Sequence, residues 1–373
     1  MRHAPDCAIW RSKSTPRGPA VFLDFGAGCG EFARAREAAG RWSNLAGNIV
    51  APMRSYLDFE KPVAELETKV EELRALAEKG EGVSISEELT KLEAKASKAL
   101  ADLYASLTPW QKIQVARHPQ RPHFSDYVKQ LVTEFTPLAG DRFFGEDAAI
   151  VGGFGRFNGE PICIIGQEKG SDTASRLHHN FGMARPEGYR KAVRLMELAD
   201  RFGLPVVSLV DTAGAFPGID AEERGQAEAI ARSTDASLSL GVPNVAVVVG
   251  EGGSGGAIAI AAANKVLMLE HAVYTVASPE ASASILWRDS AKAQDAATSM
   301  KITAQDLLKF GIIDVIVTEP SGGAHRDPRA AIAAAGDAVS LELSRLTNLS
   351  REQLRHARAE KFLAMGRKIE EKR

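Results

Sequence analysis

Five of the seven residues from Gly250 to Gly256 are glycines, and they lie between a β-branched run and a run rich in Ala and Ile. Glycine lacks a Cβ and tolerates positive φ, so such a segment can point bare backbone N–H groups at an oxygen atom. The composition predicts a loop between a strand and a helix, with amides that bind an oxygen of a closely approaching ligand.

A second turn of related composition, residues 211–215, follows the apolar run 206–210. Each turn comes after a predicted strand and before a predicted helix, where free amides and the helix dipole favour negative charge. Two such turns together can form an oxyanion hole, which needs no ionisable side chain. In this interpretation Asp211 is a turn or helix-cap residue at the end of its strand.

The same glycines also match a different kind of site. Gly250-x-Gly252-x-x-Gly255 fits the dinucleotide-binding fingerprint, and Glu270 lies about where a ribose-binding acid belongs. A dinucleotide-dependent oxidoreductase that uses residues 250–255 is therefore the alternative function. No Lys-Ser or Lys-Thr pair follows the glycines, which excludes an ATP-type phosphate loop. We expect no Gly-x-Ser-x-Gly nucleophile elbow in this segment, and Ser254 has no assignable base partner, which argues against a serine hydrolase.

A basic segment precedes both turns. His178 and His179 are adjacent and no third ligand is evident, so we expect no metal site. The arginines around them could bind an anionic substrate tail, and Arg190 is the candidate. The other members of this group are Arg176, Arg185 and Arg194.

The composition is that of a globular protein with a substantial core, with 45% hydrophobic residues and a net charge of −2 over 373 residues. This charge gives no bulk attraction to nucleic acid or to an anionic membrane, so neither is an expected partner. Three widely spaced cysteines, Cys7, Cys29 and Cys163, favour a reducing compartment. No apolar run reaches the length of a membrane span, and no secretory signal is evident, so we expect a cytoplasmic protein.

Apolar residues recur every three or four positions from Val63 to Leu76 and again from Leu89 to Leu103, which predicts two antiparallel helices. A Ser-x-x-Glu capping box at residues 84–87 predicts the start of the second. Such a helical hairpin is more typical of packing or of a subunit interface than of catalysis.

The rest of the chain reads as an α/β domain. Asn158-Gly159 between apolar runs predicts a β-hairpin of strands 148–154 and 161–166. Later apolar strands alternate with glycine turns and Ala-rich helices, which predicts a largely parallel sheet with helical cover. These strands are expected at 206–210, 245–249, 266–269 and 312–317.

Several long segments resemble, in order, the carboxyltransferase alpha subunits of bacterial acetyl-CoA carboxylases. They are Gly145–Gly153, Asn180–Met183, Pro186–Ala192, Ala221–Gln226, Gly250–Gly256, Ala283–Trp287 and Gly322–Arg326. The similarity runs from about Leu57 to beyond Arg326, so it covers the helical hairpin as well as the α/β domain.

This resemblance implies the crotonase-like (ClpP/crotonase) α/β fold of repeated ββα units, preceded by the helical hairpin. We expect the hairpin at 53–110, the carboxyltransferase domain at 111–345 and a C-terminal helix or tail at 346–373. Residues 1–52 have no counterpart in the family. We expect them to be a poorly ordered extension, with Met53 as an alternative translation start.

The resemblance also implies a function: transfer of a carboxyl group from carboxybiotin to acetyl-CoA, which yields malonyl-CoA for fatty acid biosynthesis. The family works as an α2β2 assembly in which the beta subunit holds the CoA thioester and carries zinc. Carboxybiotin arrives on a biotin carboxyl carrier protein, and biotin carboxylase performs the ATP-dependent step. No covalently bound cofactor is expected on this chain.

Carried onto this sequence, the resemblance places the backbone amides of Gly255 and Gly256 on the ureido oxygen of biotin as an oxyanion hole. The carboxybiotin side of the site would further include Gly252, Gly253, Ala257, Gly214 and Ala215. The sequence departs from the family pattern in this region at Ala213, which replaces the proline common in the family's Asp-Thr-Pro-Gly turn.

A third, non-enzymatic interpretation makes the chain a scaffold that binds partners through its helical hairpin. In that case Gly256→Val should leave assembly and function intact, whereas a catalytic subunit should assemble and lose turnover.

Overall fold

The computed structural model describes residues 55–78 and 83–367. These residues belong to one compact unit of the chain that begins at Ser55. The expected extension 1–52 and the alternative start at Met53 lie outside the described residues.

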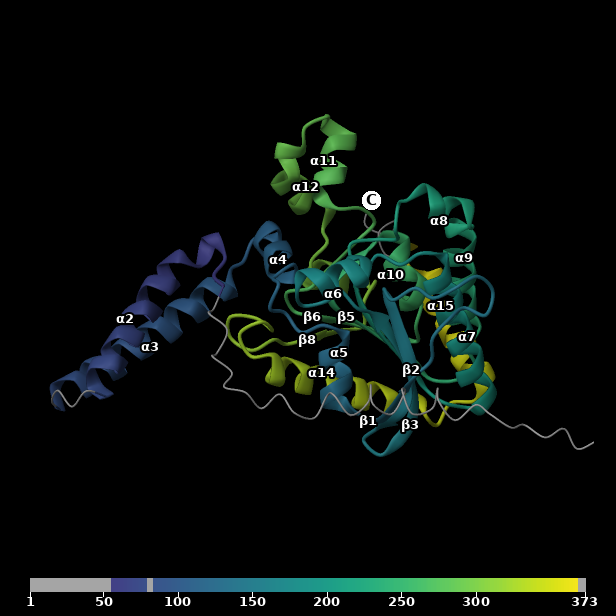
Figure 1. Ribbon diagram of the computed structural model, residues 1–373, viewed down its shortest axis with the longest axis horizontal. Coiled ribbons are helices and arrows are strands. Elements are labelled where there is room, and N and C mark those ends of the chain that lie inside the picture. Colours follow the sequence, from purple (N-terminus) through teal and green to yellow (C-terminus); the bar gives the residue numbers. More distant parts are fainter. Residues whose placement is uncertain (1–54, 79–82, 368–373) are drawn as a thin grey trace, which may run out of the picture. The chain divides into compact units, whose positions relative to one another are not determined.

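A mixed eight-stranded sheet forms the centre of this unit (Figure 1). Its first three strands pair antiparallel, and from β3 onward all neighbours are parallel. The strand order is β1-β2-β3-β4-β5-β6-β8, and the short β7 pairs with the end of β5. The strands are β1 (Val132–Pro137), β2 (Ile150–Phe157), β3 (Glu160–Gln167), β4 (Val206–Thr212), β5 (Asn244–Gly253), β6 (Lys265–Leu269), β7 (Val273–Thr275) and β8 (Val315–Val317).

The predicted β-hairpin is confirmed, because β2 and β3 pair in register and are joined by Asn158 and Gly159 alone. Both loop residues have positive φ, 51° and 83°, as a type I′ turn requires. The predicted central strands are confirmed as well. Every residue of β4 is buried, as expected for a parallel strand covered on both faces.

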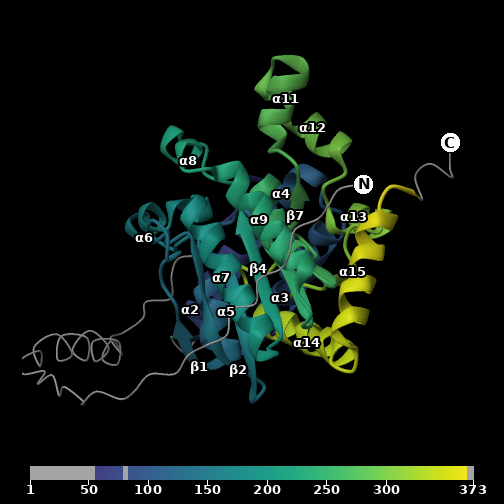
Figure 2. The same ribbon diagram turned by 90° about the vertical axis from the view of Figure 1, so that its right-hand side faces the viewer.

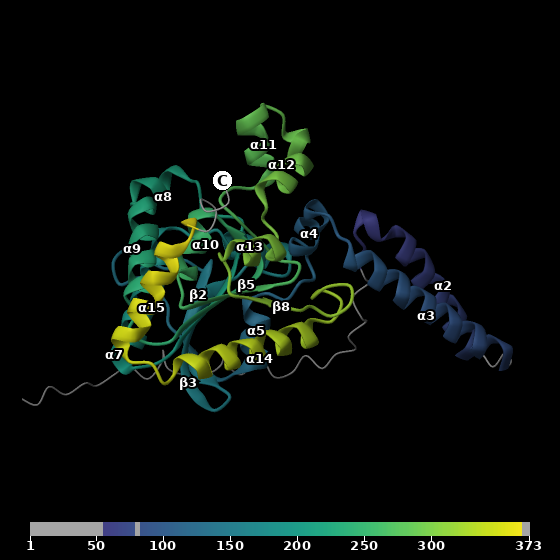
Figure 3. The same cartoon turned by 180° about the vertical axis from the view of Figure 1, so that it is seen from behind.

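Helices cover both faces of the sheet. On one face α7 (Pro186–Phe202) and α9 (Gln226–Ser239) lie side by side, and α10 (Ser254–Ala261) packs between α9 and the strands β4 and β5 (Figure 2). On the other, α5 (Phe124–Leu131) and the long α14 (Pro328–Leu346) contact each other, and α14 crosses β5, β6 and β8 (Figure 3). The core therefore lies in two layers, one on each side of the parallel strands.

The N-terminal hairpin consists of α2 (Lys61–Glu78) and α3 (Val83–Ala105), as the periodicity predicts. The predicted capping box is wrong, because α3 already begins at Val83 and Ser84 is inside it. The hairpin is anchored to the α/β domain by Glu60, which is fully buried. Its carboxylate accepts from Tyr104 Oη at 3.0 Å and pairs with Arg326 at 2.9 Å.

The remaining helices are short or lie near the chain end. Two of them, α11 (Pro279–Trp287) and α12 (Ala293–Met300), stand out from the sheet and its covering helices in all three views (Figures 1, 2 and 3). The others are η1 (Asp58–Glu60), α4 (Pro109–Ala116), α6 (Thr173–His178), η2 (Asn180–Gly182), α8 (Ile219–Glu223), η3 (Ser290–Lys292), α13 (Ala304–Phe310) and α15 (Arg351–Ala364). Among the described residues, none of the helices has the length and apolarity that a bilayer span needs.

Candidate functional site

The glycine-rich run is not the loop that its composition predicts. Strand β5 continues to Gly253, and helix α10 begins at the next residue, Ser254. The change from strand to helix takes place at Ser254, which has a positive φ of 52° although it is not a glycine. Gly252 to Gly256 fits the Gly-x-Ser-x-Gly pattern of a nucleophile elbow, so the expectation that this pattern is absent is wrong.

Most of these glycines are required by neighbours inside the chain. A Cβ on Gly250 would overlap the carboxylate of Asp211, and one on Gly252 would lie 2.8 Å from the ring of Tyr274. A Cβ on Gly253 would run into the carbonyl of Ala213. Neighbours inside the chain are sufficient to require glycine at these three positions, so no ligand is needed to explain them.

Gly256 and Gly255 differ in the space that an added Cβ atom would have. A Cβ on Gly256 would lie 2.7 Å from the carbonyl carbon of Gly214 and 2.8 Å from the nitrogen of Ala215, both backbone atoms that cannot move independently. A Cβ on Gly255 would meet only the Ile230 side chain, at 3.4 Å. Gly255 is thus the one glycine of the run that internal packing does not demand.

These contacts bring the two predicted turns together, and we call residues 213–215 and 253–257 the glycine corner. Gly214 has a φ of 155°, and Thr212 Oγ1 both accepts from its N–H at 3.1 Å and donates to its carbonyl at 2.7 Å. The first amides of α10 have no acceptor within the helix, and its N-cap, Gly253, has no side chain to supply one. The corner therefore presents a helix N-terminus beside a second, rigid turn, and it contains no ionisable side chain.

Next to the corner, the ladder between β4 and β5 is irregular. Val210 pairs with Val248 and Thr212 with Gly252, so Asp211 alone faces three residues of β5. Such bulges redirect a strand end and leave backbone groups without ladder partners. This bulge places Gly252 and Gly253 against the turn 213–215.

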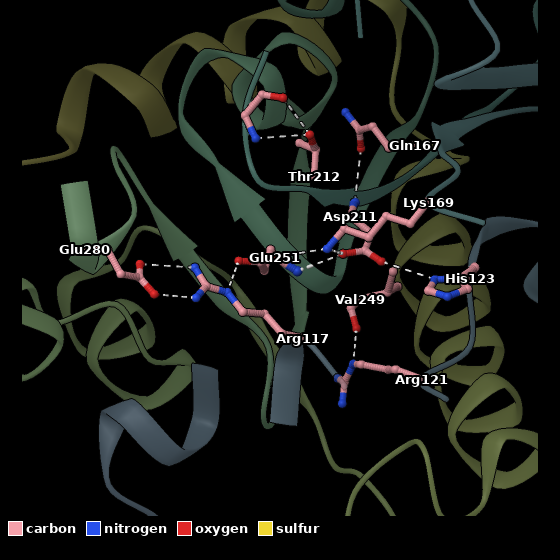
Figure 4. A network of polar contacts seen from close by, with 11 residues as sticks. Arg117, Arg121, His123, Gln167, Lys169, Asp211, Thr212, Val249, Glu251 and Glu280 are labelled. Atoms are coloured by element: carbon pink, nitrogen blue, oxygen red, sulfur yellow. Dashed lines mark hydrogen bonds and ion pairs between the residues drawn. The ribbon is translucent and has the colours of Figure 1, made fainter. Parts of the chain in front are cut away.

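Buried side chains take up backbone groups that have no ladder partner around this bulge and at the end of the β3–β4 ladder (Figure 4). Asp211 N–H donates to Gln167 Oε1 at 3.1 Å, and Glu251 N–H donates to Asp211 Oδ1 at 2.9 Å. The carbonyl of Val249 accepts from Arg121 Nε at 2.7 Å. Asp211 is therefore not the turn or helix-cap residue that the sequence analysis expects, because its carboxylate holds the bulge.

Charged groups complete this arrangement. Lys169 Nζ lies 2.8 Å from Asp211 Oδ1 and 2.9 Å from Glu251 Oε2, and His123 Nδ1 lies 3.6 Å from Asp211 Oδ2. Arg117 Nε is 2.6 Å from Glu251 Oε1. We call Arg121, Gln167, Lys169, Asp211 and Glu251 the bulge cluster.

The bulge cluster is held in its charged form. Burial by itself would raise the pKa of Asp211, but the Lys169 ammonium and the nearby His123 outweigh it and hold the pKa well below its usual range. Burial likewise opposes ionisation of Glu251, and Lys169 and Arg117 overcome it, so this pKa is also lowered. Burial would lower the pKa of Lys169, but the two carboxylates raise it. The cluster is a compensated set of charges and not a group poised to exchange protons near neutral pH.

Arg190, the candidate for an anionic substrate tail, is engaged within the chain. Its guanidinium donates to the carbonyl of Arg224 and lies 3.8 Å from Asp141 Oδ2 and 3.9 Å from Glu187 Oε1. Arg194 donates to the carbonyls of Gly140 and Ala139. These contacts tie α7 to the loop before β2 and to Arg224, and none of them reaches the glycine corner.

The dinucleotide alternative has no support in the geometry. Glu270 Oε2 accepts from the N–H of Glu319 at 3.2 Å, so this carboxylate already has a backbone donor. Strands β3, β4, β5, β6 and β8 follow one another across the described sheet in a single direction. Dinucleotides bind where the strand order reverses, and this part of the sheet has no such reversal.

Gln167 and Lys169 were not identified from the sequence. Gln167 is the last residue of β3, and Lys169 lies two residues beyond it. A polar residue at the carboxyl end of a buried parallel strand is a signal for such positions, because ligand sites gather at that edge.

Comparison with known proteins adds the family. The family model described as "Acetyl co-enzyme A carboxylase carboxyltransferase-like" matches residues 56–366. The acetyl-coenzyme A carboxylase carboxyl transferase subunit alpha of Nitrobacter winogradskyi is 73% identical over 318 residues, 85% of this chain and 99% of the relative. The protein of the same name from Beijerinckia indica is 74% identical over 317 residues, 85% of this chain and 100% of the relative.

Among solved structures, transcarboxylase 12S aligns with a TM-score of 0.50 and 19% identity, covering 61% of this chain and 42% of that one. This likeness concerns the fold alone and agrees with the expected crotonase-like class. The family model and the relatives carry the assignment: the chain belongs to the acetyl-CoA carboxylase carboxyltransferase family.

Proposed function

We propose that this chain is the alpha subunit of an acetyl-CoA carboxylase carboxyltransferase, which moves a carboxyl group from carboxybiotin to acetyl-CoA and forms malonyl-CoA. The support is the name shared by relatives at 73% and 74% identity, which match over nearly their whole length. The reaction needs stabilisation of negative charge on oxygen more than it needs a nucleophile.

The glycine corner supplies that stabilisation. The structural observation that supports this site is the close approach of Gly256 to the backbone of Gly214 and Ala215, which joins two turns at one point. The amides of Gly255 and Gly256 would donate to the ureido oxygen of biotin as the N–CO2 bond breaks. Gly252, Gly253, Ala257, Gly214 and Ala215 would form the surrounding wall on the carboxybiotin side.

Other chains complete the reaction in this proposal. A beta subunit with zinc holds the thioester of acetyl-CoA in an α2β2 assembly, and a biotin carboxyl carrier protein delivers carboxybiotin made by biotin carboxylase. The methyl proton of acetyl-CoA passes to the biotin nitrogen that releases the carboxyl group. The resulting enolate takes the carboxyl group, so atoms and charge balance.

The test is reconstitution. Purified alpha and beta chains, carboxybiotin and acetyl-CoA should yield malonyl-CoA, and either chain alone should yield little or none. Absence of malonyl-CoA from the complete mixture would contradict the proposal. Saturable binding of a nicotinamide cofactor by the isolated chain would also contradict it.

Gly255→Ala probes the corner within this assay. Because only Ile230 lies near the added methyl group, the variant should fold and assemble normally. The methyl group would occupy the approach to the amides, and we expect turnover to fall by about tenfold or more. Full turnover in this variant would remove the oxygen site from Gly255. Gly256→Val does not serve this purpose, since its side chain would disrupt the backbone contact that holds the corner together.

A further inference from the structure

We propose that Gln167 is the positioning residue that holds the two turns of the glycine corner in register for the reaction. The inference rests on the proposed function, because it assigns a role to a side chain that does not itself reach the substrate oxygen. Gln167 would fix the distance between the backbone amides of the two turns, because both sets must donate to the same substrate oxygen.

The contacts of Gln167 reach both turns. Its Oε1 accepts from the N–H of Asp211 at 3.1 Å, just before the turn 213–215. Its Nε2 donates to the carbonyl of Gly256 at 3.0 Å, in the first turn of α10. The side chain is 1% exposed, so water does not compete for either bond.

The end of the β3–β4 ladder explains why a side chain is needed there. Regular pairing stops at Gly166 and Leu209, so the N–H of Asp211, which points to the β3 side, would be buried without an acceptor. Backbone groups in this position are normally satisfied by a side chain or by ordered water. A glutamine at the end of β3 supplies the acceptor and adds a donor to α10, so one rigid amide group joins β3, β4 and α10.

The surrounding charges explain why this group is neutral. Lys169 lies within 2.9 Å of both the Asp211 and the Glu251 carboxylate beside Gln167, so each carboxylate already has a cationic partner, and His123 Nδ1 lies 3.6 Å from Asp211 Oδ2. A carboxylate at position 167 would add a buried negative charge beside Asp211 and could not donate to Gly256.

Two variants separate positioning from plain stability. Gln167→Met keeps the approximate shape and removes both bonds, whereas Gln167→Glu keeps the acceptor and regains a donor only when protonated. Asn244→Leu is the matched control, because Asn244 is a buried amide at the other end of β5 that donates to Ser237 Oγ.

The first readout does not depend on activity. In the isolated alpha chain, amide hydrogen exchange of residues 211–215 and 254–257 should be about tenfold faster in Gln167→Met than in the wild type, since both turns lose a fixed bond. The control should leave exchange at the corner unchanged. Wild-type exchange at both turns in Gln167→Met would overturn the inference.

The second readout is turnover with the beta subunit. We expect kcat of Gln167→Met to fall by about 100-fold with little change in KM for acetyl-CoA, as for a misplacement of catalytic groups by a fraction of an ångström. Gln167→Glu should match it at pH 8 and recover relative to the wild type toward pH 6, because the buried carboxyl takes up a proton and then donates to Gly256.

Each outcome separates the two proposals. An unchanged kcat in Gln167→Met, or a Gln167→Glu to wild-type ratio that does not vary with pH, would refute the positioning role. If the wild-type mixture itself makes no malonyl-CoA, the proposed function fails, and faster exchange in Gln167→Met would still support the structural link between the turns.

Discussion

The glycine corner and the bulge cluster lie side by side and are built from opposite materials. The corner presents backbone amides and has no ionisable side chain, whereas the bulge cluster consists of side chains that are buried or, for Lys169 and Glu251, partly buried, four of them charged. The corner suits charge stabilisation on a substrate oxygen. The cluster holds the irregular strands that place the corner. The backbone amides proposed to bind the substrate oxygen and the carboxylates with lowered pKa values, Asp211 and Glu251, are therefore different groups.

The comparison also changes how strongly perturbed carboxylates are interpreted. Shifted pKa values often mark catalytic groups. Here Asp211 and Glu251 are shifted because Lys169 is shared between them, and both carboxylates hold backbone or ion-pair partners. Their role is structural, and variants should separate the two regions by the size and the kind of their effects.

The largest effect is expected for Lys169→Met in the bulge cluster. The change leaves Asp211 and Glu251 buried without their shared cation, and we expect a loss of about 3–5 kcal/mol in the free energy of unfolding. Urea denaturation at pH 7 measures it. A loss below about 1 kcal/mol would mean that the cluster does not hold the fold, against the comparison drawn above.

Acid should act on the same cluster in a predictable direction. Asp211 and Glu251 have lowered pKa values in the folded protein, so their stabilisation is complete above the ordinary values of about 3.9 and 4.3 and is lost as the pH falls below them. In Lys169→Met the two carboxylates lack their shared cation and take up protons more readily. Unfolding titrations from pH 7 to pH 3 should therefore show the gap between wild type and variant narrowing in acid, and a constant gap would contradict this account.

An intermediate effect is expected inside the corner. Gly256→Ala places a methyl group 2.7 Å from the Gly214 backbone, and we expect about 1–3 kcal/mol of destabilisation. Gly255→Ala is the matched control and should stay within about 0.5 kcal/mol of the wild type. Thermal denaturation of both variants checks this, and equal losses would show that the two glycines do not differ as the packing indicates.

The smallest effect is expected at the exposed edge of the charge network. The Arg117 and Glu280 side chains are 34% and 38% exposed and lie 2.6 Å apart, so Glu280→Gln should cost less than about 1 kcal/mol. Glu251→Gln removes a buried partner of both Arg117 and Lys169 and should cost clearly more. Parallel urea denaturation of the two variants tests the ranking, which a larger loss in Glu280→Gln would reverse.

Much of the fold follows from local patterns. The helical hairpin follows from apolar spacing between Val63 and Leu103, and the β2–β3 hairpin follows from Asn158-Gly159. The glycine run was located correctly between a strand and a helix, although the strand proved longer and the loop absent. The family motifs led to the family that the comparisons establish.

The sequence by itself determined the helical hairpin, the β2–β3 hairpin and the main parallel strands, because these depend on neighbours close along the chain. Only the tertiary structure decided which glycines are required by packing. An added Cβ would clash at Gly250, Gly252 and Gly253, where the neighbours are Asp211, Tyr274 and Ala213, but not at Gly255. It also decided that Gln167 joins Asp211 to Gly256, residues 44 and 89 positions away along the chain. Such contacts arise where a ladder ends or a bulge interrupts it and backbone groups are left unpaired, and no local sequence pattern indicates which distant side chain will reach them.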